Sequence, residues 1–116
     1  MDAEMEGEPK IGRITVAPEV LETIARLTTL AVPGVARLQS SAGVGRLLRQ
    51  GGVRIEMVGS SAAIELHVVT EPDINLLRIG HQIQAEVTRA IQDLVGMEVH
   101  SVDVYVEDVG SPPEKA

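Results

Sequence analysis

The sequence feature that most constrains the fold is an amphipathic run over residues 75–96. When successive residues are placed about 100° apart, as in an α-helix, the apolar side chains gather on one stripe. That stripe holds Leu76, Gly80, Ile83, Val87, Ala90, Ile91 and Leu94. The pattern predicts a long helix lying on a sheet, with Asp73 as its N-cap and Gly96 at its C′ position. Gly80, on the apolar stripe, is expected to let helix and sheet approach closely.

Runs that alternate apolar and polar residues, as half-buried strands do, lie on both sides of this helix. The runs at 53–58 and 62–70 flank Gly59-Ser60-Ser61, which predicts two adjacent antiparallel strands. A last strand is predicted near residues 99–106. There the alternation points Val102, Val104 and Val106 one way and Ser101, Asp103 and Tyr105 the other.

The N-terminal part of the chain predicts a strand followed by a helix. Residues 11–16 alternate, with Ile14 and Val16 on one face and Arg13 on the other. Pro18 then suits the first position of a helix that ends near residues 33–34. The apolar residues at helical spacing there are Val20, Ile24, Leu27 and Ala31. Residues 35–38 fit a short extended piece, and residues 42–52 fit one or two amphipathic turns.

The predicted order is therefore strand, helix, strand, strand, helix, strand. This order indicates an α+β fold of the split βαββαβ type, a mostly antiparallel four-stranded sheet with two helices on one face. A chain of 116 residues is long enough for one such domain. We expect the domain at residues 11–109, an acidic disordered tail at 1–10 and a second disordered tail at 110–116.

Composition narrows the class of protein. The chain has no Cys, which excludes disulfides and thiolate metal sites. Its acidic start lacks the basic and apolar regions of a secretory signal, and no apolar run has the length of a membrane span. These features lead us to expect a cytoplasmic protein.

No motif for catalysis or cofactor binding stands out, and we expect no enzyme activity, metal or cofactor. The three histidines, His67, His81 and His100, lack metal-ligand spacing and are interpreted as scattered surface or edge residues. The serines lack a nucleophile elbow, and surface carboxylates are usually a solvating face. Gly43-Val44-Gly45 does not complete a dinucleotide-binding pattern, because Leu48 occupies the third glycine position, and no Lys-Ser/Thr follows as a phosphate-binding loop requires.

Charge is distributed unevenly along the chain. The net charge is -7, yet the interval between Glu22 and Glu56 holds five arginines and no carboxylate. A cationic stretch in an acidic chain could contact an acidic partner or a phospholipid surface, or it could be a solvated loop. Two arginines contribute only about 1 kcal/mol each near an anionic bilayer, which favours a protein partner over lipid alone. The candidate partner-binding residues are Arg37, Arg46, Arg49, Arg54 and Tyr105.

An RNA-binding sheet is the alternative from another class of function. Sheets of this topology often stack bases on aromatic side chains. This chain offers only Tyr105, with no Phe or Trp and no Gly-x-x-Gly clamp. The sequence therefore favours a protein-interaction module over an RNA-binding one.

Taken whole, residues 11 to 109 resemble the bacterial alkaline shock protein family. Three stretches carry the resemblance: residues 12–20, which lead into a helix; Val32-Pro33-Gly34-Val35-Ala36; and the run from Asn75 to Val106. The last stretch includes Leu94-Val95-Gly96-Met97-Glu98-Val99 and Val102-Asp103-Val104-Tyr105-Val106. These are matches to the pattern of a whole domain, not to a catalytic signature.

The resemblance implies a cytoplasmic, non-enzymatic protein linked to cell-envelope stress or homeostasis. It also implies self-association into a homo-oligomer and binding to a membrane-anchored partner, which would hold the protein at the inner face of the membrane. It implies neither catalytic residues nor a small-molecule substrate. The chain departs from the family in having little polar tail beyond the domain, which does not favour an abundant, filament-forming role.

Overall fold

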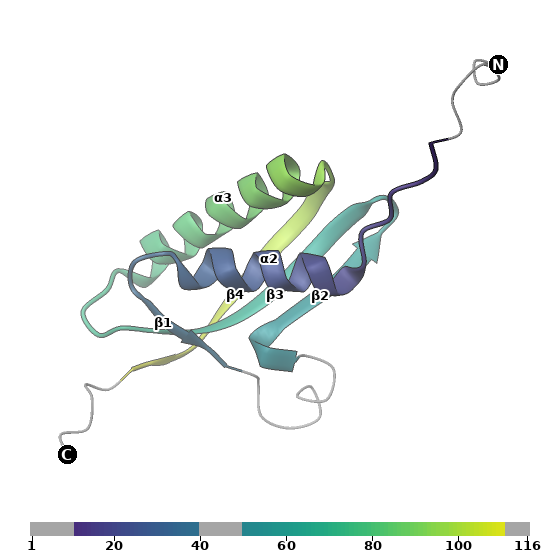
Figure 1. Cartoon of the computed structure of the whole chain (residues 1–116). Coiled ribbons are helices and arrows are strands. Elements are labelled where there is room, and N and C mark those ends of the chain that lie inside the picture. The colour runs from purple at the N-terminus through teal and green to yellow at the C-terminus, as the bar shows by residue number, and fades with distance from the viewer. Residues whose placement is uncertain (1–10, 40–49, 111–116) are drawn as a thin grey trace.

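The computed structural model describes residues 11–39 and 50–110. Predictions for residues 1–10, 40–49 and 111–116, which include Arg46 and Arg49, lie outside the described residues. The elements are α2 (Pro18–Leu30), β1 (Val35–Leu38), the 3-10 turn η2 (Gln50–Gly52), β2 (Val53–Val58), β3 (Ser61–Thr70), α3 (Leu76–Val95) and β4 (Glu98–Val109). Both helices lie on one face of the sheet (Figure 1). The α+β class, a four-stranded sheet and two helices on one face of it are as predicted, although one of the four predicted strands is replaced by another.

The sheet is organised around β3, which pairs with each of the other three strands. β4 runs parallel to it along residues 61–70, whereas β2 and β1 are antiparallel and pair with residues 61–66 and 68–70. Because β4 takes one edge of β3 along its whole length, β1 and β2 must share the other edge, end to end. Two of the three pairings are antiparallel, as the mostly antiparallel prediction requires.

The junction between β1 and β2 depends on Gly52. Its φ is 81°, a left-handed conformation that glycine adopts readily. A Cβ there would lie 2.8 Å from the Gln39 nitrogen and 2.9 Å from the His67 oxygen, and these two atoms are joined by a backbone hydrogen bond of 2.9 Å. Glycine therefore lets the two strands follow one another along β3.

The strand predicted over residues 11–16 is not formed. These residues precede α2 without strand pairing, and the strand in the N-terminal half is β1, after the helix. The side chains of Ile11 and Ile14 are 86% and 93% exposed. Alternation gave the segment a strand pattern, but a strand also needs a neighbouring edge, which a local pattern does not reveal.

Helix α2 has the predicted bounds but buries a different stripe. Pro18 begins it, and it ends before the turn at Val32-Pro33-Gly34. The buried residues are Leu21, Ala25 and Thr29, spaced by four. The predicted stripe was wrong in large part, since Val20 and Leu27 are exposed and only Ile24 packs against the core. The small side chains of Ala25 and Thr29 let the helix lie close to its neighbours. The predicted face is also apolar, and the sequence does not show which of the two faces meets the sheet.

The N-cap of helix α3 lies two residues later in the chain than predicted. The Asn75 side chain accepts a hydrogen bond from the Arg78 N–H at 2.9 Å, so Asn75 is the N-cap. Asp73 lies in the preceding turn with φ 62° and was wrongly predicted to cap the helix. At the other end Gly96 has φ 77° and donates to the carbonyls of Ile91 and Gln92, as predicted for a C′ glycine.

The buried stripe of α3 runs through Ile79, Ile83, Val87 and Ile91. The last three were predicted, but Leu76 and Leu94, at the helix ends, are exposed. The expected role of Gly80 in close packing is also wrong, because a Cβ there would meet no atom within 4 Å.

The core between helices and sheet is built almost entirely of aliphatic side chains, with Thr29 of α2 also fully buried. Every second side chain of β3 contributes to it, namely Ala62, Ile64, Leu66 and Val68. The remaining members are Leu21, Ala25, Val32, Val35, Val53, Ile79, Ile83, Val87, Ile91 and Val102. The intervening β3 side chains must then point to the other face of the sheet.

Candidate functional site

The candidate site is the outer face of the sheet, defined as the side opposite α2 and α3. Residues 65, 67 and 69 of β3 share this face because they alternate with core residues. Their cross-strand partners are Arg54 on β2, Tyr105 on β4 and Arg37 on β1. Three of the predicted partner-binding residues thus lie along about 13 Å of one face.

His67 is the centre of this face. Its side chain is only 4% exposed, with Nε2 2.7 Å from Glu65 Oε2 and Nδ1 in a short contact with Glu107 Oε2. The Tyr105 ring stacks on the imidazole, with ring centroids 4.7 Å apart and planes within 6° of parallel. We call Arg54, Glu65, His67, Tyr105 and Glu107 the outer-face cluster.

The imidazole of His67 lies between two carboxylates, those of Glu65 and Glu107. A neutral imidazole has one N–H donor and one lone pair, so it can donate to only one of two carboxylates. Both contacts depend on the position of this one ring.

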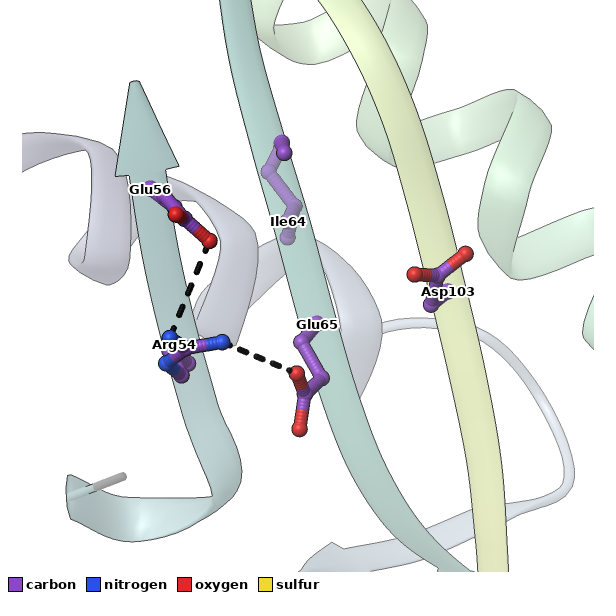
Figure 2. A pocket seen from close by; sticks show the side chains of 6 residues that line it. Arg54, Glu56, Ile64, Glu65 and Asp103 are labelled. Carbon is purple, nitrogen blue, oxygen red and sulfur yellow. Dashed lines mark hydrogen bonds and ion pairs between the residues drawn. The ribbon is translucent and has the colours of Figure 1, made fainter. Parts of the chain in front are cut away.

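Arg54 extends the outer-face cluster towards β2. Its guanidinium lies 3.3 Å from Glu65 Oε1 and 3.7 Å from Glu56 Oε1 (Figure 2). With Asp103 on β4 these residues line a shallow hollow of about 100 Å³. Small-molecule sites usually occupy about 300–1,000 Å³, so the hollow is better suited to one side chain of a partner than to a substrate.

The predicted partner-binding residues have different surroundings. Arg54 is engaged in ion pairs, and Tyr105 is half exposed with one ring face covered by His67. Arg37 is exposed on β1 and donates to the Gln39 side chain at 3.4 Å. Arg46 and Arg49 lie outside the described residues. The structure thus brings Arg54 and Tyr105 into one cluster and places Arg37 farther along the same face.

Sequence reasoning missed Glu65, His67 and Glu107. His81 and His100 are exposed, as expected, but the interpretation of His67 as a surface or edge histidine was wrong because its side chain is buried. The available signals were two pairs of polar residues at a spacing of two, Glu65 with His67 and Tyr105 with Glu107. They gain meaning only once the register of β3 and β4 is known.

The rest of the described residues contains larger hollows but no metal site. Across residues 11–39 and 50–110, no group of three His, Asp or Glu residues could hold a metal ion. Two hollows of about 290 and 250 Å³ lie beside Pro33 and Gln82, at the seam of α2 and α3. Within the same ranges, neither helix has the length and apolar character needed to cross a bilayer.

Residues 6–111 match the alkaline shock protein 23 family, which is described as having a cell envelope-related function. The chain belongs to this family. The match covers most of the sequence and agrees with the resemblance in the stretches that surround α2, α3 and β4. As a member of the alkaline shock protein 23 family, the protein has a cell envelope-related function.

Two family relatives occur in Bacillus subtilis (strain 168). The uncharacterized protein YqhY is 20% identical over 102 residues, which cover 83% of this chain and 76% of YqhY. The uncharacterized protein YloU is 23% identical over 108 residues, which cover 86% of this chain and 90% of YloU. Neither name assigns an activity, so the family relationship describes the setting and not the partner.

Solved structures of the MamM CTD have a similar fold. One variant superposes with a TM-score of 0.55 at 17% identity, covering 88% of this chain and 91% of that one. A manganese form gives a TM-score of 0.52 at 16% identity, covering 79% of this chain and 99% of that one. At such identity the likeness concerns the fold of this family member, not its ligands.

Proposed function

We propose that this protein is a non-enzymatic interaction module of the cell envelope. It self-associates, and it binds a membrane-anchored protein through the outer face of its sheet. The observation that carries the proposal is the outer-face cluster. Its buried histidine is engaged on both ring nitrogens and stacked on one ring face, an arrangement that orders the surrounding side chains. Ordered polar groups around a half-exposed aromatic ring are typical of the contact surfaces of proteins.

Charge indicates the kind of partner. On the outer face Arg37 and Arg54 are outnumbered by four carboxylates, those of Glu56, Glu65, Asp103 and Glu107. Anionic lipid headgroups would be repelled by such a face, whereas a basic segment would be attracted. Membrane proteins carry Lys and Arg in their cytoplasmic flanks, so the flank of a membrane-anchored protein is a complementary ligand.

The same charge does not favour the RNA-binding alternative. Phosphate backbones bind to surfaces with an excess of Lys and Arg, and single-stranded bases need several stacking rings. The outer face offers one aromatic ring, Tyr105, whose one side is already covered by His67.

The test is sedimentation with membrane vesicles from the native cells. We expect the wild-type protein to pellet with vesicles, and Asp103→Lys to reduce the bound fraction at least fivefold. The matched control is Asp93→Lys, which makes the same charge change on the exposed side of α3 and should bind like wild type. Protease treatment of the vesicles should abolish binding, because the ligand is a protein.

Two outcomes would contradict the proposal. Binding that survives the protease would identify lipid as the ligand. Equal losses for Asp103→Lys and Asp93→Lys would mean that total charge, and not the outer face, controls binding.

A further inference from the structure

Residues 11–16 form an arm that pairs with none of the described strands. The arm extends away from the sheet before α2 begins (Figure 1). Ile11 and Ile14 are 86% and 93% exposed, and only Val16 packs against the core. These two β-branched side chains leave apolar surface in contact with water, which a partner could cover.

The arm has the sequence of a strand, with Ile14 and Val16 on one face and Arg13 on the other. We infer that residues 11–16 add as a strand to the open edge of β2 in a second copy of this chain. The second copy does the same in return, so that the two chains exchange their arms. The inference rests on the proposed self-association and names the surface that carries it.

The open edge of β2 matches the arm in length and chemistry. Within the described ranges β2 pairs only with β3, which leaves the backbone groups on its other edge available. Strand and arm have six residues each, or about 20 Å. Met57 near the end of β2 is 46% exposed on the face opposite Glu56, where Ile14 could cover it. Glu56, exposed on the outer face, offers a carboxylate to Arg13.

Because the connection to α2 is short, the arm is better placed to pair with a second copy than with the sheet of its own chain. A single residue, Ala17, separates the arm from the helix, and connections between a strand and a packed helix usually need two or more residues. Because Pro18 follows, Ala17 is held away from the helical region, and it is extended with φ -68° and ψ 147°. The chain therefore enters α2 without a reversal and points its arm outward.

The edge of β4 fits the arm less well. β4 has twelve residues, and its register with β3 shifts twice, near His100 and near Glu107. Irregularities of this kind twist an edge and hinder the addition of a further strand. β2 pairs with β3 without any such shift.

The first test is the mass in solution, measured by light scattering during size-exclusion chromatography. The monomer is 12.4 kDa, and we expect the wild-type protein to run as a dimer of twice that mass. Ile14→Asp should weaken dimerisation at least tenfold without affecting the fold, because the side chain is already in water. Leu77→Asp, at a 70% exposed position on α3, is the matched control and should dimerise like wild type.

The second test locates the arm by disulfide cross-linking. The chain has no native Cys, so only the introduced cysteines can form a disulfide. Ile14→Cys and Met57→Cys are prepared as separate proteins of different mass, mixed and oxidised. A heterodimer joined by one disulfide is expected, since these two sites can meet only between chains in such a mixture. The double variant Ile14→Cys, Met57→Cys reports pairing within one chain as a cross-linked monomer.

The outcomes separate this inference from the proposed function. A monomeric wild-type protein would remove self-association altogether. A wild-type dimer that Ile14→Asp leaves intact would overturn the arm exchange while self-association stands. A cross-linked monomer without the heterodimer would assign the arm to its own sheet and would also overturn the exchange.

Discussion

At the scale of single residues, His67 links two strands that are far apart in the sequence, β3 and β4. It lies on β3, its two carboxylate partners are Glu65 on the same strand and Glu107 on β4, and the ring of Tyr105 covers its face. Because the imidazole separates two carboxylates that would otherwise repel each other, it has a structural role whatever the outer face binds.

Replacing this histidine tests that role. His67→Ala removes the stacking contact and leaves Glu65 and Glu107 partly buried without the group between them. We expect the free energy of unfolding to fall by about 2–3 kcal/mol, measured by urea denaturation. His81→Ala, on the solvent side of α3, should change it by less than about 0.5 kcal/mol. Equal effects of the two variants would mean that the outer-face cluster contributes nothing to stability.

At the scale of secondary-structure elements, two glycines of α3 and its C-terminal cap should respond in opposite ways to replacement by Ala. Gly80 lies inside the helix with open space around its missing Cβ, whereas Gly96 closes the helix with a positive φ. Gly80→Ala should therefore stabilise the protein by about 0.5–1 kcal/mol, and Gly96→Ala should destabilise it by about 1 kcal/mol. Thermal denaturation checks both signs, and a destabilised Gly80→Ala would mean that the helix needs close approach there after all.

The elements that could be predicted from the sequence are those whose signals are local. The period of α3, the hairpin of β2 and β3 and the glycine at 96 all depend on residues within a few positions of one another. The failures concern partners. The arm at 11–16 has a strand pattern but no edge to join, and the two apolar faces of α2 differ only in which one meets the sheet. The environment of His67 depends on the register of β3 and β4, which is set by contacts across some forty residues.

At the scale of the whole molecule, every strand pairing among the described residues passes through β3. The amides of Leu66 and its neighbours in the middle of β3 lie between two strands, so they can exchange with solvent only when the sheet opens. We expect their exchange, followed by NMR, to report the global free energy of unfolding measured with urea. Amides of the short edge strand β1 should exchange faster. Faster exchange in β3 than in β1 would contradict a central role for β3.

The position of β3 also determines what happens to the sheet when the chain is cut. β1, β2 and β4 are held in the sheet through this one strand, and within the described ranges none of them pairs with another. A cut at the Gly59-Ser60 turn would separate β1 and β2 from β3, the strand with which both of them pair, and would leave the second fragment with β3 and β4 alone. The two fragments would therefore have to bind each other to recover the four-stranded sheet, so the domain folds as a single unit.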